Sequence, residues 1–170
     1  FAWVPTHNLN HHRHVNREGD ATITWRHTNR NTWYVAVSYF FVSAYYQSFP
    51  TSTFLKKAKA TNPAFHRRIM GQYAFWIGGY VALLATAIAL HGPGQGTYVF
   101  LMVVGLPAFF ALWTIMVFNY TQHIHTDPWS EHNHSRSFTG KLTNFFLFNN
   151  GLHAAHHEQA GAHWTKLPAL

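Results

Sequence analysis

The residues with the clearest capacity for chemistry are histidines, which make up 15 of the 170 residues. Seven of them fall into three clusters that lie far apart in the chain. The clusters are His7-Asn8-Leu9-Asn10-His11-His12, Asn119-Tyr120-Thr121-Gln122-His123 and His153-Ala154-Ala155-His156-His157. Neutral imidazole binds zinc, copper, iron and nickel, so the clusters predict a metal centre without selecting its metal. The chain has no Cys, which excludes thiolate-bound zinc, cysteine-held iron–sulfur clusters and thiolate-ligated haem.

The spacing within the clusters indicates how the imidazoles would be arranged. On an α-helix, residues three and four apart are neighbours, so His153, His156 and His157 would project from one face. In the first cluster His7 and His11 share a face, whereas His12 is rotated away by roughly a third of a turn or more. This layout suits two metal ions, with adjacent histidines serving different ions. The alternative is a solvated, histidine-rich basic surface.

Only five residues are acidic, too few for the glutamate-rich site of soluble di-iron helix bundles. Four of them lie near the clusters, where they would either accept hydrogen bonds from ligand N–H groups or balance the charge of nearby arginines. These four are Asp20, Asp127, Glu131 and Glu158. Further histidines that could support ligands are His14, His125, His132, His134 and His163. The remaining histidines, expected at a surface or interface, are His27, His66 and His91.

Two long uncharged stretches predict how the clusters are positioned. Residues 69–90 and 97–118 each have the roughly 20 residues that a helix needs to cross a bilayer, and residues 91–96 form a Gly- and Pro-rich turn between them. The alternative is a pair of buried helices in a large soluble core. All twelve Lys and Arg lie outside residues 69–118, so the positive-inside rule places both outer ends of this hairpin in the cytoplasm. The three clusters would then share one face of the membrane.

The aromatic, uncharged segment 32–49 is a third long element. As a third span it would put basic residues on opposite sides of the membrane, so we expect a helix that lies in the interface. Segment 50–68 is a basic connector suited to anionic headgroups. The predicted fold is therefore all-α: a membrane helical hairpin, interfacial helices and a histidine-rich helical cap. The cap comprises the cytoplasmic segments 1–31 and 119–170.

At these residues the chain resembles the membrane fatty-acid desaturases, a histidine-box family of non-haem di-iron enzymes, and the related alkane hydroxylases. The resemblance is carried by HNLNHH with its trailing N-x-x-G-D, by NYTQH, and by NNGLHAAHH followed by HW. It implies that two iron ions are bound and that Asn119 reaches one of them through water. The iron ligands that it implies are His7, His11, His12, His123, His153, His156 and His157.

The chain departs from the desaturase pattern in two ways. Its first cluster has the spacing HxxxHH, which alkane hydroxylases share, where desaturases usually have HxxHH. The upstream first histidine box and an earlier membrane hairpin are missing. We therefore interpret residues 1–170 as a single partial desaturase-like domain, and we expect the chain on its own to be inactive because it does not complete both metal sites.

The function that the resemblance implies is an integral, multi-pass membrane oxidoreductase that uses O2 and external electrons to desaturate a fatty acyl chain. Its partners would be a fatty acyl lipid, membrane lipids and a ferredoxin- or cytochrome b5-like electron donor, because the chain has no flavin or nicotinamide fingerprint. Residues 145–148 and 33–49 could line an acyl tunnel. One alternative is an alkane or lipid hydroxylase. Another is a histidine-rich metal transporter, although transport sites place ionisable residues within spans and these spans have none. Nucleic-acid binding is not expected, because no recognised module is present.

Overall fold

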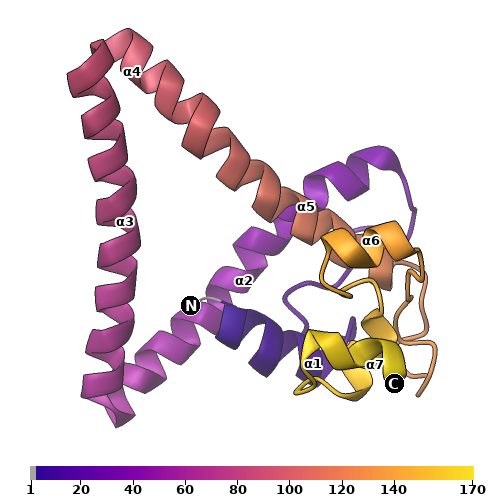
Figure 1. The fold of residues 1–170 in the computed structure, drawn as a ribbon. Coiled ribbons are helices and arrows are strands. Elements are labelled where there is room, and N and C mark those ends of the chain that lie inside the picture. The colour runs from indigo at the N-terminus through magenta and orange to yellow at the C-terminus, as the bar shows by residue number, and fades with distance from the viewer. Residues whose placement is uncertain (1–2) are drawn as a thin grey trace. The chain divides into compact units, whose positions relative to one another are not determined.

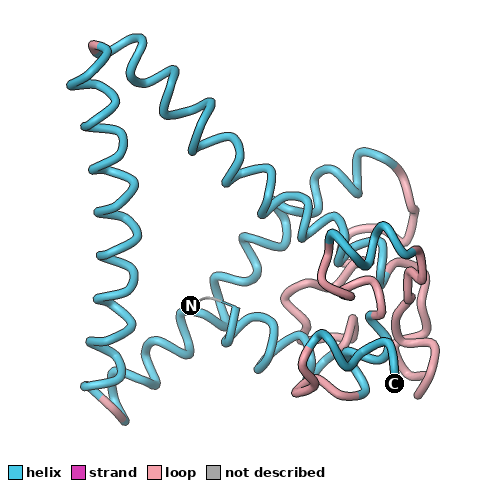
Figure 2. The backbone as a smooth tube through the Cα atoms, in the orientation of Figure 1, coloured by secondary structure: helices cyan, strands magenta, loops and turns pink. Residues whose placement is uncertain are grey.

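The structure is a computed structural model that describes residues 3–170, and within this range it contains helices and loops but no strand (Figures 1 and 2). The all-α prediction is confirmed. The elements are η1 (Val4–His11), α1 (His12–His14), α2 (Trp33–Thr61), α3 (Pro63–His91), α4 (Pro93–Phe100), η2 (Leu101–Gly105), α5 (Leu106–His123), α6 (Lys141–Phe146), α7 (His153–Glu158) and η3 (Trp164–Ala169). Both η1 and η2 are π-helices, and η3 is a 3-10 helix.

The chain divides into two compact units. The hairpin unit is Thr51–Ile115, and the histidine unit is the described part of Ala2–Pro50 together with Met116–Leu170. Helices α2 and α5 each contribute to both units. The boundary in α2 falls at Pro50, which lacks the N–H group for a helical hydrogen bond and lies inside the helix.

Two helices are long and apolar enough to cross a membrane: α3, and the continuous helix Pro93–His123 formed by α4, η2 and α5. They contain the predicted spans 69–90 and 97–118. Their apolar side chains face outward, with 74% of Phe75 and 72% of Leu90 exposed. Helices in the core of a soluble protein would bury such residues, so these helices fit a lipid environment.

The turn between the two helices is shorter than the predicted turn 91–96. Asn62 starts α3 by accepting a hydrogen bond from the main-chain N–H of Phe65, and α3 ends at His91. The next residue, Gly92, has a φ of 80°, which suits a residue without a side chain. Pro93 then begins α4 directly, since proline is favourable in the first helical turn. Because α4 packs closely on α3, a Cβ at Gly96 would overlap the main chain of Ala87.

Pro107 lies inside the second long helix, and the chain adapts by forming the π-helix η2 just before it. The main-chain N–H of Leu106 bonds to the carbonyl oxygen of Leu101, five residues earlier. Proline has no N–H to donate in the helix, and its ring clashes with the carbonyl one turn earlier. A wider π-turn tolerates the missing hydrogen bond and relieves this clash.

Helix α2 is longer than the predicted helix 32–49, since it continues through Pro50 into the expected basic connector and ends at Thr61. Its interfacial location stays a prediction. In the histidine unit, Tyr39 of α2 packs against Tyr120, Met116 and Ile124 at the end of α5. This apolar cluster fixes α2 against the segment that carries His123.

The close approach at Gly96 gives a matched pair of substitutions. Gly96→Ala places a methyl group against the Ala87 main chain and should destabilise the hairpin unit by about 1–3 kcal/mol. Gly94→Ala meets nothing within 4 Å and should be neutral or slightly stabilising, because alanine favours the helix. Thermal unfolding of both variants in detergent micelles checks this, and equal melting temperatures would contradict the packing at Gly96.

Candidate metal centre

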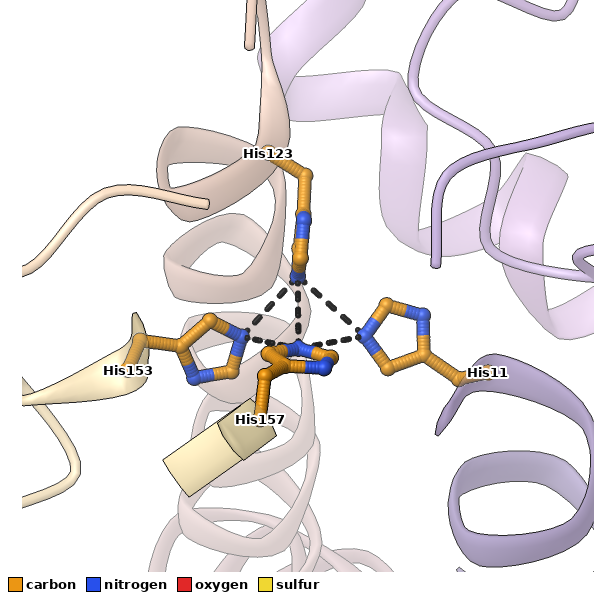
Figure 3. A group of neighbouring side chains, drawn as sticks. All are labelled: His11, His123, His153 and His157. Carbon is orange, nitrogen blue, oxygen red and sulfur yellow. Dashed lines mark hydrogen bonds between the residues drawn. The ribbon is translucent and has the colours of Figure 1, made fainter. Parts of the chain in front are cut away.

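The structure brings all seven predicted ligand histidines together in two groups. The four-histidine group consists of His11, His123, His153 and His157 (Figure 3). The three-histidine group consists of His7, His12 and His156. Within each group the imidazole nitrogens lie within 4.8 Å of one another. Both groups lie within the histidine unit, and they join segments that are more than 100 residues apart in the chain.

The four-histidine group has the dimensions of a metal site. The Nε2 atom of His123 lies 3.1 Å from that of His11, 2.9 Å from that of His153 and 3.3 Å from that of His157. The Nε2 atom of His157 lies 3.3 Å from that of His11 and 3.1 Å from that of His153. Nitrogens bound to one ion at about 2.0–2.1 Å lie about 2.9–3.4 Å apart in octahedral or tetrahedral geometry. The group therefore has the size of a coordination shell.

Hydrogen bonds fix which ring nitrogen carries the proton in two of these imidazoles. Nδ1 of His11 lies 2.8 Å from the Asp20 carboxylate, and Nδ1 of His123 lies 3.2 Å from the carbonyl oxygen of His134. Both partners accept, so each Nδ1 donates, and in the neutral form that binds metal each Nε2 carries a lone pair. The two lone pairs face each other across 3.1 Å. Such an arrangement is repulsive without a cation, so the donor set fits a transition-metal ion.

The three-histidine group forms a nearly equilateral triangle of nitrogens. The Nε2 atom of His12 lies 3.1 Å from that of His7 and 3.0 Å from that of His156. The Nε2 atoms of His7 and His156 are 3.2 Å apart. Three nitrogens at these distances can occupy one face of a metal ion. The remaining coordination positions are then open to other ligands.

The spacing HxxxHH is accommodated by the π-helix η1. Its hydrogen bonds run from residue i to i+5, as between the carbonyl of His7 and the N–H of His12, and one turn takes roughly 4.4 residues. His11 and His12 therefore lie on either side of His7, one turn away. The rings of His7 and His11 stack with their centroids 5.3 Å apart, as expected for a shared face, yet they belong to different groups: His7 joins His12, and His11 joins the other group.

Helix α7 divides its histidines in the same way. His153 and His157, one α-helical turn apart, belong to the four-histidine group, whereas His156 belongs to the other. All three come from the same short helix, as their spacing predicts, but they serve two centres. Each doublet, His11-His12 and His156-His157, is divided between the two groups, and the expectation that adjacent histidines serve different ions stays a prediction.

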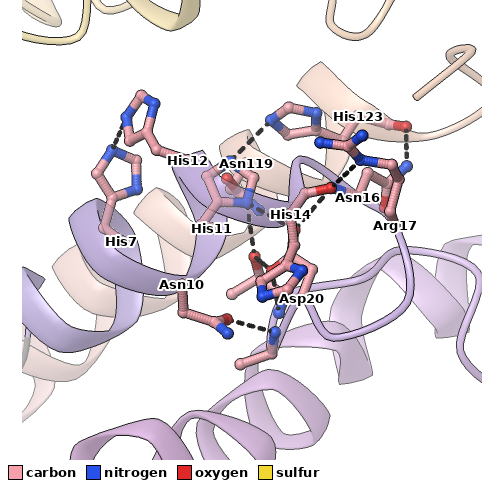
Figure 4. Close-up of polar contacts among 12 residues, drawn as sticks. His7, Asn10, His11, His12, His14, Asn16, Arg17, Asp20, Asn119 and His123 are labelled. Atoms are coloured by element: carbon pink, nitrogen blue, oxygen red, sulfur yellow. Dashed lines mark hydrogen bonds and ion pairs between the residues drawn. The ribbon is translucent and has the colours of Figure 1, made fainter. Parts of the chain in front are cut away.

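A buried carboxylate supports the four-histidine group (Figure 4). Asp20 is 1% exposed, and its oxygens accept hydrogen bonds from the main-chain N–H groups of Asn16 and Thr22, both at 2.7 Å, and from the Thr22 hydroxyl at 2.7 Å. Burial raises the pKa of Asp20, but the neighbouring His11 and the hydrogen bonds from His11 and Thr22 outweigh it and hold the pKa well below its usual range. The ionised carboxylate keeps the proton of His11 on Nδ1.

The other predicted supporting residues have different places. Asp127 accepts from the main-chain N–H of Trp129 at 2.9 Å, and Glu158 lies 3.9 Å from exposed His132. The main-chain carbonyl of Glu131 accepts from His134. His134 supports a ligand, although through its carbonyl oxygen rather than its ring. The remaining candidates make local contacts: His125 with the carbonyl of Asn29, His163 with Thr165, and the carbonyl of His14 with Arg17.

Two residues that sequence reasoning left without a role connect the segments of the site. Asn16 is buried with a φ of 59°, donates to the carbonyl oxygen of His123 at 2.9 Å and accepts from Thr24. The sequence feature that could have identified Asn16 is its position as the first residue of the N-x-x-G-D pattern. Tyr39 donates its hydroxyl hydrogen to the Thr22 carbonyl and accepts from the amide of Asn119 at 2.9 Å. The water-mediated metal contact of Asn119 stays a prediction.

Burial and mutual repulsion lower the pKa of several of these imidazoles and so favour their neutral form. Burial, and then the neighbouring His156 and His11, lower the pKa of His12 to about 4. Burial also lowers the pKa of His7, His153 and His157 well below 6.5, with neighbouring imidazoles adding to the effect. Neutral imidazole is the form that binds metal, so protons compete with metal at a lower pH than for exposed histidines.

Comparison with known proteins gives one family. The sequence model described as Fatty acid desaturase matches residues 1–170. No curated protein and no solved structure gives a significant match.

Stability of the metal-free protein should fall as the pH decreases from about 6.5. Histidines of the unfolded chain take up protons there, while buried His153 does not, so protonation favours the unfolded state by about 1.4 kcal/mol per pH unit for each such histidine. Denaturation in micelles between pH 7.5 and 5 measures this slope. His153→Gln should reduce it, and His132→Gln, at an exposed position, should leave it unchanged. A pH-independent stability would contradict the buried neutral state.

Removing the carboxylate behind His11 should weaken metal binding. We expect Asp20→Asn to lower the affinity of the four-histidine group about 10–100-fold, because the amide no longer holds the proton of His11 on Nδ1 by charge. Metal titration followed by calorimetry checks this. Asp127→Asn is the matched control at a turn carboxylate, and equal affinities for the two variants would refute the supporting role.

Proposed function

The chain belongs to the fatty acid desaturase family, and from that premise we propose that it acts at two iron ions to desaturate a fatty acyl chain, using O2 and externally supplied electrons. The observation that carries the proposal is the gathering of seven imidazoles into groups of four and three. Two adjacent groups of neutral nitrogen donors match a pair of transition-metal ions. The family match supports iron as the metal.

In this proposal each side chain has a definite task. His11, His123, His153 and His157 would hold one ion, and His7, His12 and His156 the other. Bound iron supplies the capacity to activate O2 with external electrons. The protein orients the ligands: Asp20 and the carbonyl of His134 keep the Nε2 atoms of His11 and His123 free of protons.

The open coordination positions of the three-histidine group suit a reaction that needs access for small ligands. Asn119 lies four residues before His123 and donates to the Tyr39 hydroxyl, and we propose that it contacts one ion through water.

The substrate and electron donor follow from the chemistry of the surroundings. Two exposed apolar helices suit an integral membrane protein with an acyl lipid as substrate. The distribution of Lys and Arg supports a cytoplasmic location for the histidines. A ferredoxin- or cytochrome b5-like protein is the proposed electron donor, attracted by the net charge of +7. Reduction rates that do not change with ionic strength would contradict this attraction.

The nature of the product separates desaturation from hydroxylation. The HxxxHH spacing, which the π-helix η1 accommodates, favours the hydroxylase as the second candidate. Both reactions begin at an unactivated methylene; loss of two hydrogens gives a double bond, and insertion of oxygen gives an alcohol. Mass spectrometry of lipids from cells that produce the full-length protein distinguishes an olefin from an alcohol.

Single substitutions in either group should abolish turnover. We expect His156→Ala and His157→Ala in the full-length protein each to remove product formation and to lower bound iron, because each group loses a ligand that the remaining imidazoles do not replace. Lipid profiling and iron analysis of the purified protein are the measurements. His132→Ala is the control, since this side chain is exposed. Full activity with unchanged iron in either ligand variant would refute the assignment.

A further inference from the structure

We propose that helix α6 is a membrane-surface anchor of the histidine unit, whose exposed apolar face inserts among the lipids beside the end of α5. The face consists of Leu142, Phe145 and Phe146, which are 71%, 76% and 66% exposed. Positions i, i+3 and i+4 lie on one side of a helix, so the three side chains form a continuous apolar stripe. Stripes of this kind on a protein surface mark contact with a membrane or another apolar partner.

Helix α6 directs its apolar side chains outward and a polar side chain toward the protein, which is the reverse of a surface helix in a soluble protein. Its polar residue Asn144 turns inward, where the amide donates to the carbonyl oxygens of Phe138 and Gly140 at 2.7 and 3.1 Å. Thr143, beside it, is less exposed than the apolar residues that flank it. The polar face is thus occupied by the protein's own main chain, and the apolar face is directed outward.

The loop that carries α6 is too tightly bonded to turn this face inward. The main-chain N–H of Phe138 bonds to the carbonyl of Gly151 at 2.7 Å, and that of Asn149 bonds to the carbonyl of Asn144 at 2.8 Å. Gly151 leaves no room for a side chain, because a Cβ there would lie 2.6 Å from the Phe138 carbonyl oxygen. These contacts within the loop therefore fix the outward direction of the stripe.

Contacts with α5 favour a lipid surface as the occupant. The ring of Phe138 lies 5.3 Å from the ring of Phe118, at the end of the predicted span 97–118. The N–H of Arg136 bonds to the carbonyl of Gln122 at 2.8 Å, and the Gln122 amide donates to the carbonyl of Asn150 at 2.9 Å. These bonds hold both ends of the α6 loop against the last turns of α5, the end of a helix that is long and apolar enough to cross a membrane, and this favours lipid as the occupant.

The charges near α6 suit the same partner. Residues 132–157 contain Arg136 and Lys141 and have no Asp or Glu. Cations beside an apolar stripe are typical of helices that lie in the interface of anionic membranes. The sequence prediction that residues 145–148 line an acyl tunnel is not matched for Phe145 and Phe146, because their side chains are exposed. This anchor goes beyond the proposed reaction and would hold the metal centre at the level of the lipid surface.

Because the chain has no Cys, single cysteines can be introduced and spin-labelled without a background. We expect labels at Leu142→Cys, Phe145→Cys and Phe146→Cys, in nanodiscs of zwitterionic and anionic phospholipid, to collide with O2 several-fold more than with a water-soluble nickel chelate. Thr143→Cys, on the inward face, and Glu131→Cys, at an exposed acidic position, are the controls. Their ratio of O2 to nickel collisions should be several-fold lower.

Two outcomes would overturn the proposal. If Phe145→Cys is as accessible to the nickel chelate as Glu131→Cys, the stripe faces water. If it is accessible to neither reagent, another protein or a second copy of the chain covers it. Retained metal binding in each variant shows that the label has not unfolded the histidine unit, and the measurement does not depend on turnover.

Discussion

The convergence of imidazole lone pairs is the interaction on which the rest of the structure depends. The Nε2 atoms of His11 and His123 lie 3.1 Å apart, and five further imidazoles crowd around them. Neutral imidazoles that point lone pairs at one another repel, and burying them is unfavourable; bound cations would make the same arrangement favourable. The surrounding loops, with Asp20 and Asn16, hold the rings in this geometry.

Pairs of adjacent histidines allow one short segment to contribute a side chain to each of the two histidine groups. Neighbouring residues on a helix point in different directions, so His11-His12 and His156-His157 each contribute to both groups. The third ligand of each segment must then lie one turn away. Helix α7 achieves this with α-helical spacing from His153 to His157, whereas η1 needs a π-turn because His7 and His12 are five residues apart. The π-helix is thus a consequence of ligand spacing.

Sequence reasoning succeeds where one strong constraint acts on a continuous segment. The spans were predictable because bilayer thickness demands about 20 uncharged residues. The seven histidines that the structure gathers are those that the family resemblance implies as ligands, and their binding of iron stays a prediction. The end of α2 was not predictable, because Pro50 and the following lysines are typical of a helix end, whereas the helix continues to Thr61. The partner of His11 was not singled out either, since each of four acids lay near one of the three clusters; the structure places Asp20, nine residues along the chain, at the ring.

The charge of the site depends on how few acidic residues lie near it; the chain has five acids in all. The seven gathered side chains are neutral when they bind metal, and Asp20 is the carboxylate that contacts one of them. Two divalent ions would carry four positive charges against this single negative charge. The centre would therefore keep a net positive charge in a partly buried environment, where electrostatic interactions are stronger than in water. Open coordination positions in such a field favour electron-rich ligands, and they favour delivery of electrons to the centre.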